Sequence, residues 1–431
     1  MLFRFLPLTV KTFQGKTCSN LSSRNFKILL RSGAVSNGSY EIPARQYYKR
    51  PHSEVPPASF SFLTVDLRSD TVTKPGAAMR RAMAEAEVGD DVFGEDPTVN
   101  ELQRQMAELL GTEDTLFVPS GTMGNLISVM CHCSERGAEL LVGDESHIHL
   151  YEQGGTSQLA GVHPRTLMTL PDGTFDLNEL EYKICHNYPD PHYPRTCLIC
   201  LESTHNMKGG CVLPLSFFKE IRTIADKYKL AVHLDGARLL NAAVSLNIQP
   251  SEIVQYCDSV MMCFSKAVGA PVGSIIGGSK DFIQKAVRMR KALGGGMRQV
   301  GVLAAAALEA MSDAMERLKA DHLNARRFAE GILTFSSPLL SVDLTTVQTN
   351  IVKFKVEDTR ISPEEFCKSL QTVTEADTSS RSERVAVLMS PYPGGRVRAV
   401  WHHQVSAHDT DLTVQKVKYV TEKYKTQLLT S

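Results

Sequence analysis

The stretch Val260-Met-Met-Cys-Phe-Ser265-Lys266-Ala-Val-Gly269-Ala-Pro-Val-Gly273 places a lysine directly after an apolar run. The run has the length and composition of a buried strand, and the glycines that follow are typical of a loop. A lysine at the mouth of a buried strand can be partly desolvated, which favours the neutral and nucleophilic form of its amine. Taken alone, Lys266 is still best interpreted as an ordinary surface lysine.

Two motifs upstream make this lysine more informative. His233-Leu-Asp235-Gly-Ala-Arg238 follows an apolar run over 230–234, so a carboxylate that could pair with a protonated ring nitrogen lies at a second strand end. Ser120-Gly121-Thr122-Met-Gly-Asn125 follows a third apolar run and opens a helix, where backbone N–H groups can bind a phosphate. Phosphate-binding helix, aspartate and lysine, in this order, indicate pyridoxal phosphate bound covalently to Lys266.

Short apolar runs alternate with longer helical patterns through most of the chain. The predicted strands are 115–119, 139–143, 196–202, 230–234, 259–263 and 274–277. The predicted helices are near 75–87, 97–110, 121–132, 215–229, 237–246 and 279–292, followed by one long alanine-rich helix over 299–317. This alternation predicts an α/β fold in which helices flank a mostly parallel sheet.

The pattern changes in the C-terminal part of the chain. Strands are predicted over 351–354, 385–389 and 396–401, helices near 362–371 and 410–427, and a polar loop over 374–384. We therefore expect a leader and linker over 1–60, a large α/β domain over 61–318 and a small α+β domain over 319–431.

The charges balance overall but not at the N-terminus. Lysine plus arginine and aspartate plus glutamate both number 47, so no general basic field favours nucleic acid as a partner. Residues 1–60 contain nine basic and two acidic residues, and no acid precedes Glu41. This composition is typical of a mitochondrial transit peptide, and a basic tail on a cytoplasmic protein is the alternative. No apolar run approaches the ~20 residues that a membrane-spanning helix needs.

The ten cysteines of the sequence include two pairs with zinc-like spacing, Cys131-His-Cys133 and Cys197-Leu-Ile-Cys200. The second pair lies in an apolar strand pattern, where residues three positions apart point to opposite faces. Free cysteines are commonly small core residues. We therefore expect structural thiols, no metal site and no disulfides.

The chain resembles the low-specificity L-threonine aldolases, enzymes of the aspartate-aminotransferase-like fold (fold type I) that depend on pyridoxal phosphate. The resemblance runs from about Asp66 to Val405 and implies a seven-stranded, mostly parallel sheet with a small C-terminal domain. Besides the segments quoted above, its motifs are Asp66-Leu-Arg-Ser69-Asp70-Thr71-Val-Thr73-Lys-Pro75, Gly89-Asp-Asp-Val-Phe-Gly94-Glu-Asp-Pro97, Ser146-His147-Ile-His-Leu-Tyr151-Glu152-Gln-Gly-Gly155, Glu202-Ser-Thr-His205-Asn206 and Leu293-Gly-Gly-Gly-Met-Arg298-Gln299.

The resemblance assigns roles to individual residues. Those implied to bind the cofactor are Lys266, Asp235, His147 (stacking on the ring), Arg238, Arg298 and the phosphate-binding Ser120, Gly121 and Thr122. Those implied to bind the substrate are Ser69, Tyr151, Arg238 and Arg398. His205, Lys291 and Arg298 would also line the site, some of them supplied by a neighbouring subunit. The catalytic base is left open among His147, His205 and a bound water. The segment Trp401-His-His-Gln404 departs from the family pattern, in which a threonine and a single histidine follow the arginine that corresponds to Arg398.

The activity implied is retro-aldol cleavage of L-threonine and L-allo-threonine, and of similar β-hydroxy-α-amino acids, to glycine and an aldehyde. Such an enzyme would take part in threonine catabolism and glycine formation as a homo-oligomer, a dimer or a tetramer, with shared active sites. A related β-eliminating amino-acid lyase and a non-catalytic homologue that binds the cofactor are the alternatives.

Overall fold

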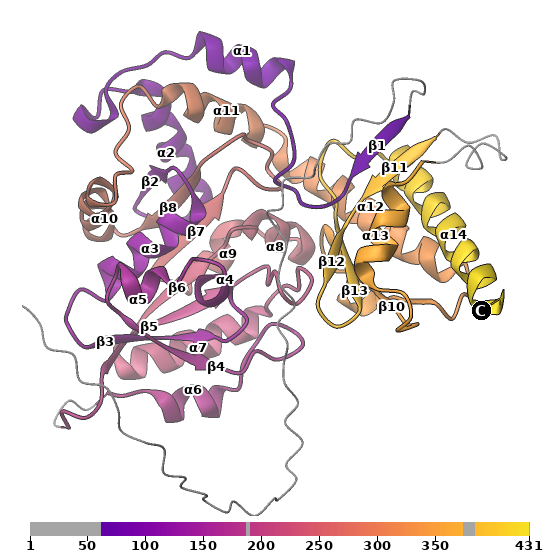
Figure 1. The fold of residues 1–431 in the computed structure, drawn as a ribbon. Helices are drawn as coiled ribbons and strands as arrows, with labels where there is room; N and C mark the ends of the chain where they lie inside the picture. The colour runs from indigo at the N-terminus through magenta and orange to yellow at the C-terminus, as the bar shows by residue number, and fades with distance from the viewer. Residues whose placement is uncertain (1–61, 187–189, 374–383, 431) are drawn as a thin grey trace, which may run out of the picture. The chain divides into compact units, whose positions relative to one another are not determined.

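The computed structural model describes residues 62–186, 190–373 and 384–430 (Figure 1). The leader and linker predicted over 1–60 lie outside the described residues, as does the predicted loop over 374–384 except for its last residue. Residues Phe60–Ser431 belong to one compact unit. The boundary at residue 318 stays a prediction, and it falls within a helix, α12 (Ala314–Leu333).

A seven-stranded sheet forms the centre of the large α/β part (Figure 1). Its strands, in order across the sheet, are β2 (Asp114–Val118), β8 (Ser274–Gly278), β7 (Ser259–Cys263), β6 (Ala231–Asp235), β5 (Arg195–Glu202), β3 (Ala138–Gly143) and β4 (His163–Leu167). The pairs from β7 to β4 are parallel, whereas β8 is antiparallel to both of its neighbours. The prediction of a mostly parallel seven-stranded sheet is therefore confirmed.

Helices pack on both faces of this sheet. One face is covered by α3 (Gly121–His132) and α10 (Lys280–Ala292), through apolar side chains such as Ile127 and Ile283. The opposite face is covered by α2 (Pro97–Leu110), α7 (Leu215–Tyr228), α8 (Leu239–Leu246), α9 (Pro250–Val254) and α11 (Gly301–Met311). The remaining helices of this part are α1 (Ala77–Glu85), α4 (His147–Leu150), α5 (Gly155–Gln158) and α6 (Leu177–Lys183).

The single helix predicted over 299–317 is wrong. The segment forms α11 and the start of α12, and the break lies at Ser312 and Asp313. Asp313 adopts φ −133° and ψ 17°, which is outside the helical region, so the chain changes direction there although the apolar pattern continues.

The C-terminal part has its own sheet and core. Its strands β12 (Ser390–Tyr392), β13 (Arg396–Val400), β10 (Ile351–Val356) and β9 (Leu340–Ser341) are antiparallel neighbours in this order. They pack with α12, α13 (Pro363–Gln371) and α14 (Ala407–Thr430) around the buried Trp401 and Phe328, whose rings lie 4.9 Å apart. None of the helices in the described residues is long and apolar enough to cross a membrane.

The first strand of the described chain joins this C-terminal part. β1 (Leu63–Asp66) pairs in parallel with β11 (Val385–Leu388), and Val65 belongs to the C-terminal core. The backbone of Leu67 then pairs with Leu388 and Val400. The segment that leads into Ser69 and Asp70 is therefore fixed against the C-terminal part of the chain.

The expectation that Cys197 and Cys200 face opposite sides of their strand is wrong. The register between β3 and β5 pairs Glu139 with Thr196 and Leu140 with Leu198, so Cys197 is skipped. A bulge of this kind re-aims a side chain. Cys197 consequently packs against the same cluster as Cys200, on the α3 side of the sheet.

Candidate active site

The carboxyl ends of β5, β6 and β7 bring polar side chains together at one edge of the sheet. Glu202 and Asp235 end β5 and β6 and are neighbours in register. Both are buried, Asp235 with 1% of its surface exposed. Lys266 follows β7 closely and lies within electrostatic range of His147 and of Asp70. Ligand sites in open α/β sheets occupy this edge.

The N-terminus of α3 lies close to the strand that leads to Lys266. Ser120 caps the helix, because its Oγ accepts a hydrogen bond from the backbone N–H of Met123 at 3.2 Å. Gly121 has to be small, since a Cβ there would lie 2.8 Å from Cys263 Sγ and 3.0 Å from Met261 Cε. The first N–H groups of a helix have no acceptor within it, so this end suits a phosphate.

Asn125, on the second turn of α3, connects the two buried carboxylates of the site. Its Nδ2 donates to Asp235 Oδ2 at 3.0 Å and to Glu152 Oε1 at 2.8 Å. The backbone N–H of Ala237 donates to the other oxygen of Asp235 at 3.1 Å. Both oxygens of Asp235 are thus held by neutral donors.

A chain of hydrogen bonds continues from Asn125 away from the site. His233 Nε2 lies 3.1 Å from Asn125 Oδ1, His233 Nδ1 lies 2.8 Å from Ser259 Oγ, and Ser259 Oγ lies 2.8 Å from His132 Nε2. Burial lowers the pKa of His132 to about 4 and that of His233 to about 3, so both rings are neutral at neutral pH.

The acceptor Asn125 Oδ1 sets the direction of every link in this chain. Because a carbonyl oxygen can only accept, His233 must donate from Nε2 and accept at Nδ1 from the Ser259 hydroxyl. Ser259 then accepts from His132 Nε2–H. The donors all point toward Asp235, an arrangement in which each bond polarises the next.

His147 begins α4 and is held by two glutamates. Its backbone N–H donates to Glu202 Oε2 at 2.6 Å, and its Nδ1 lies 2.9 Å from Glu152 Oε1. Burial lowers the pKa of His147, but the hydrogen bond to Glu152 and the charge of Asp235 outweigh it and raise that pKa overall. The ring of Tyr151 lies 5.5 Å from the His147 ring, and its hydroxyl donates to Met207 Sδ at 3.1 Å.

The two arginines predicted to bind the substrate converge on one oxygen. Arg398 donates to Asn206 Oδ1 from Nη2 at 3.0 Å, and Arg238 donates to the same atom from Nη1 at 3.4 Å. Arg238 also forms a buried ion pair with Asp70, the residue after Ser69. Asn206 in turn donates its backbone N–H to Glu202 at 2.8 Å. Glu202 therefore holds both Asn206, which contacts the two arginines, and His147, which is predicted to bind the cofactor.

The structure gives the remaining predicted residues, His205, Arg298 and Lys291, no hydrogen bond to Asp235, Arg238 or Arg398 among the bonds described above. His205 is buried, and within the described residues its Nδ1 has no hydrogen-bond partner. Arg298 is paired with Asp90 and its side chain is 54% exposed. Lys291 is exposed at the end of α10. Their roles stay predictions.

Four residues that hold the site together were quoted within motifs but given no role. They are Asp70, Asn125, Glu152 and Asn206. The available signal was their position, because each is a polar residue within five positions of a predicted site residue in a loop or at a helix start.

Within the described residues, the one group of three or more side chains spaced to hold a metal ion is His147, Glu152 and Asp235.

Comparison with known proteins identifies the family. The family described as beta-eliminating lyase matches residues 66–357. The probable low-specificity L-threonine aldolase 2 of Arabidopsis thaliana is 50% identical over 349 residues, which cover 81% of this chain and 94% of that protein. The low specificity L-threonine aldolase of Escherichia coli K12 is 46% identical over 279 residues, covering 65% of this chain and 82% of that protein.

The chain belongs to the low-specificity L-threonine aldolase family.

Solved structures support the fold of this aldolase family member. The Leishmania major threonine aldolase superposes with a TM-score of 0.67 at 18% identity, covering 83% of this chain and 99% of that one. An L-allo-threonine aldolase described as putative, from Listeria monocytogenes, gives a TM-score of 0.64 at 19% identity, with 83% and 96% covered. At such identities the likeness concerns the fold alone, and it confirms the predicted fold class.

The residues present fit the pyridoxal phosphate that the sequence predicts. A buried carboxylate with neutral donors on both oxygens suits a protonated ring nitrogen. The tight approach of Gly121 to β7 leaves a helix N-terminus near Lys266 for the phosphate. The His147 ring is 30% exposed, so it offers a face to a planar ligand while Glu152 fixes its orientation.

Proposed function

We propose that this protein uses pyridoxal phosphate to cleave L-threonine and L-allo-threonine to glycine and acetaldehyde. The observation that carries the proposal is the buried Asp235, held by Asn125 at the same sheet edge as Lys266. This chain contains Lys266, Asp235 and Asn125 together, and it is 50% identical to a protein named as a probable aldolase of this type.

The polar residues divide the work of cleavage between them. When bound, pyridoxal phosphate takes up the electron pair of the breaking Cα–Cβ bond. Asp235 keeps a proton at the ring nitrogen, which makes that uptake favourable. Lys266 would supply the amine that holds the cofactor. The proposed substrates carry a β-hydroxyl group, and a base must remove the proton of that group. His147, His205 and a bound water are the candidates for this base.

Arg398 and Arg238 orient the substrate through its carboxylate. A guanidinium forms paired hydrogen bonds with a carboxylate, which fixes the rotation of the substrate and selects the bond that breaks. Such a clamp reads the part of the amino acid that threonine and allo-threonine share. We therefore expect weak discrimination at the β-carbon, and activity on related β-hydroxy-α-amino acids.

A coupled assay tests the reaction. Alcohol dehydrogenase with NADH should report acetaldehyde from both threonine isomers, and glycine should appear in equal amount. Formation of pyruvate from serine or cysteine without any threonine cleavage would favour the β-eliminating lyase instead. A protein that binds pyridoxal phosphate but turns over neither class would be the non-catalytic homologue.

We also propose that active sites are shared between subunits of a homo-oligomer, a dimer or a tetramer. Arg298 is basic and 54% exposed, and it follows the glycines 294–296. A Cβ on Gly295 would lie 2.3 Å from Met123 Sδ, so this glycine segment packs against the first turn of α3. This contact supports a position of the exposed Arg298 near the edge of the site, where a second subunit could use it.

Subunit complementation tests the shared site. Lys266→Ala and Arg298→Ala should each be inactive, and co-expression of both should restore part of the activity if each site draws on two chains. A mass of one chain by light scattering for the active species would contradict the proposal. Absence of restored activity, despite proven mixed oligomers, would contradict it as well.

We propose that residues 1–60 direct the protein to mitochondria. The support is the charge of this segment, nine basic against two acidic residues, with no acid before Glu41. A fluorescent reporter fused to residues 1–60 should enter mitochondria and lose the leader. A reporter that stays in the cytoplasm would favour the cytoplasmic alternative.

A further inference from the structure

Cys133 and Cys197 meet on the α3 side of the large sheet, although 64 positions separate them in the sequence. Cys133 caps the C-terminus of α3, and its backbone N–H donates to Val129 O. Cys197 packs against the cluster that contains Cys133, because the bulge in β5 turns its side chain to that face. The two thiol groups lie close enough for each to shift the pKa of the other.

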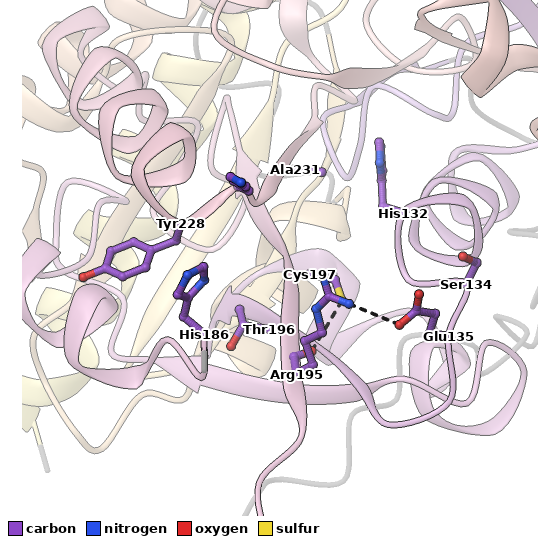
Figure 2. A pocket seen from close by; sticks show the side chains of 10 residues that line it. His132, Ser134, Glu135, His186, Arg195, Thr196, Cys197, Tyr228 and Ala231 are labelled. Carbon is purple, nitrogen blue, oxygen red and sulfur yellow. Dashed lines mark hydrogen bonds and ion pairs between the residues drawn. The ribbon is translucent and has the colours of Figure 1, made fainter. Parts of the chain in front are cut away.

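A cavity of about 450 Å³ gives solvent access to Cys197. Figure 2 shows Cys197 in its wall, beside the Arg195–Glu135 ion pair. His132 also lines this cavity. Cys197 is partly exposed, whereas Cys133 is buried behind it. A small reagent can therefore reach the Cys197 thiol, whereas the Cys133 thiol is shielded from solvent.

The two thiols differ in reactivity. The interaction with the Cys133 thiol lowers the pKa of Cys197 to about 7, with burial opposing and the charge of Arg195 assisting. The same interaction, together with burial, raises the pKa of Cys133. Because the thiolate is the reacting form, Cys197 is the nucleophile of the pair at neutral pH.

We propose that Cys197 and Cys133 form a peroxide-sensitive dithiol, in which Cys197 is oxidised first and Cys133 then closes a disulfide. Hydrogen peroxide is the oxidant. The cavity admits it, and the Cys133 thiol, which belongs to the cluster against which Cys197 packs, supplies the second reactant.

Each step balances. The Cys197 thiolate attacks one peroxide oxygen, the O–O bond breaks, and the departing hydroxide takes a proton to become water, leaving a sulfenic acid. The Cys133 sulfur then attacks the Cys197 sulfur, the S–O bond breaks, and a second water leaves with the Cys133 proton. Two thiols have lost two electrons to one peroxide.

The product would lie next to the far end of the hydrogen-bond chain to Asp235. His132, which precedes Cys133, both lines the cavity and donates to Ser259. A disulfide at Cys133 would fix the C-terminus of the helix whose other end is predicted to bind the phosphate.

Peptide mapping after peroxide treatment tests the proposal. The holoprotein is treated with hydrogen peroxide, blocked with N-ethylmaleimide and digested without reduction. We expect a peptide pair joined through Cys133 and Cys197, and the loss of about two free thiols per chain. Cys133→Ser should stop the reaction at a sulfenic acid on Cys197 that dimedone traps. Cys197→Ser should abolish both products.

Cys185→Ser serves as the matched control. Cys185 is also partly exposed, but burial raises the pKa of its thiol. This variant should form the Cys133–Cys197 bridge at the wild-type rate. First oxidation at any other cysteine, or a persistent sulfenic acid on Cys197 in the wild-type chain, would overturn the proposal.

Discussion

The guanidinium of Arg238 donates to both carboxylate oxygens of Asp70, from Nε at 2.7 Å and from Nη2 at 2.8 Å. The two side chains are 5% and 0% exposed. The pair joins the end of β6 to the segment after β1, which is anchored on the C-terminal part of the chain. The position of an arginine predicted to bind substrate therefore depends on a contact across 168 residues.

Asp70→Ala should lower both stability and substrate affinity. Removing the carboxylate strands a buried guanidinium, which costs about 3–5 kcal/mol of unfolding free energy. Asp66→Asn, which disrupts the more exposed Asp66–Arg68 pair, should cost well under that amount. Thermal unfolding and the KM for threonine measure the two effects. Equal unfolding temperatures for Asp70→Ala and wild type would contradict the assignment.

The Asp70 contribution should also depend on pH in the acid range. Burial raises the pKa of Asp70, but Arg238 outweighs it and holds that pKa at about 2. Since the unfolded value is about 4, the stabilisation is complete above pH 4 and is lost as pH falls toward 2. The difference in unfolding temperature between wild type and Asp70→Ala should shrink over that range.

Lys266→Ala should remove the visible absorbance of the cofactor and reduce turnover by several orders of magnitude, because no other amine takes its place. The circular dichroism spectrum should stay unchanged. Lys280→Ala, at an exposed helix start, is the matched control and should keep both properties. Borohydride reduction and peptide mapping of the wild type should find the pyridoxyl group on Lys266, and labelling elsewhere would refute its role.

Asp235→Asn should retain the shape of the site but slow turnover. An amide cannot keep the ring nitrogen protonated, so the cofactor becomes a weaker electron acceptor. We expect weaker cofactor binding and a drop in kcat that excess cofactor does not restore. Wild-type kcat at saturating cofactor would show that Asp235 does not serve the ring nitrogen.

Ser259→Ala should weaken cofactor binding from a distance. The hydroxyl links His132 to His233, and its loss removes the support that passes through Asn125 to Asp235. One buried hydrogen bond is worth about 1 kcal/mol, so the Kd for pyridoxal phosphate should rise about fivefold. Ser274→Ala, a buried serine on the neighbouring β8 whose Oγ contacts Cys263 Sγ, should leave the Kd unchanged. An unchanged Kd for Ser259→Ala would mean that the chain does not support Asp235.

Asp321→Asn should stabilise the protein above neutral pH. Burial, with a smaller effect of Asp70, raises the pKa of Asp321 to about 8, and among the described residues its Oδ2 has no hydrogen-bond partner. As pH rises from about 4 to about 8, the unfolded chain ionises this group and the folded chain does not, so the wild type loses stability. The unfolding temperature of the variant relative to wild type should therefore increase over this range.

Asp313→Asn is the control for this effect. Its carboxylate is 61% exposed and pairs with Arg317, which also acts on the charge of Asp321. The unfolding temperature of Asp313→Asn should differ little from that of the wild type, and this difference should not grow between pH 5 and pH 8. If the unfolding temperature of Asp321→Asn relative to wild type fell as pH rose over this range, the carboxyl group of Asp321 would not be neutral in the folded protein.

The sequence predicted the strands with a continuous or alternating apolar pattern and missed those without one. β5 and β7 are buried over nearly their whole length, so composition alone reveals them. β4, His163–Leu167, lies at the sheet edge with a histidine, a proline and an arginine, and has no comparable signal. β1 was missed because its partner β11 lies more than 300 residues away.

The sequence indicated the reacting groups of the site better than their supports. Lys266 and Asp235 stand out because a charged residue at the end of an apolar strand is unusual. The role of Asn125 depends on contacts to Asp235 and His233 more than 100 positions away. An asparagine inside a helix has no distinguishing pattern, since its partners are set by tertiary packing.

The helix α3 has three fixed positions along its length, Ser120 at its start, Asn125 within it and His132 at its end. Since each residue turns an α-helix by about 100°, one inserted residue before Asn125 would rotate its amide away from Asp235. An insertion after Asn125 would move His132 from Ser259 in the same way. Substitutions at the other positions of α3 can be absorbed by repacking unless they replace a tightly packed glycine such as Gly121, whereas a change in the length of the helix cannot. In the evolution of this chain, gaps should therefore accumulate in the turn after His132 and be absent from the twelve residues before it.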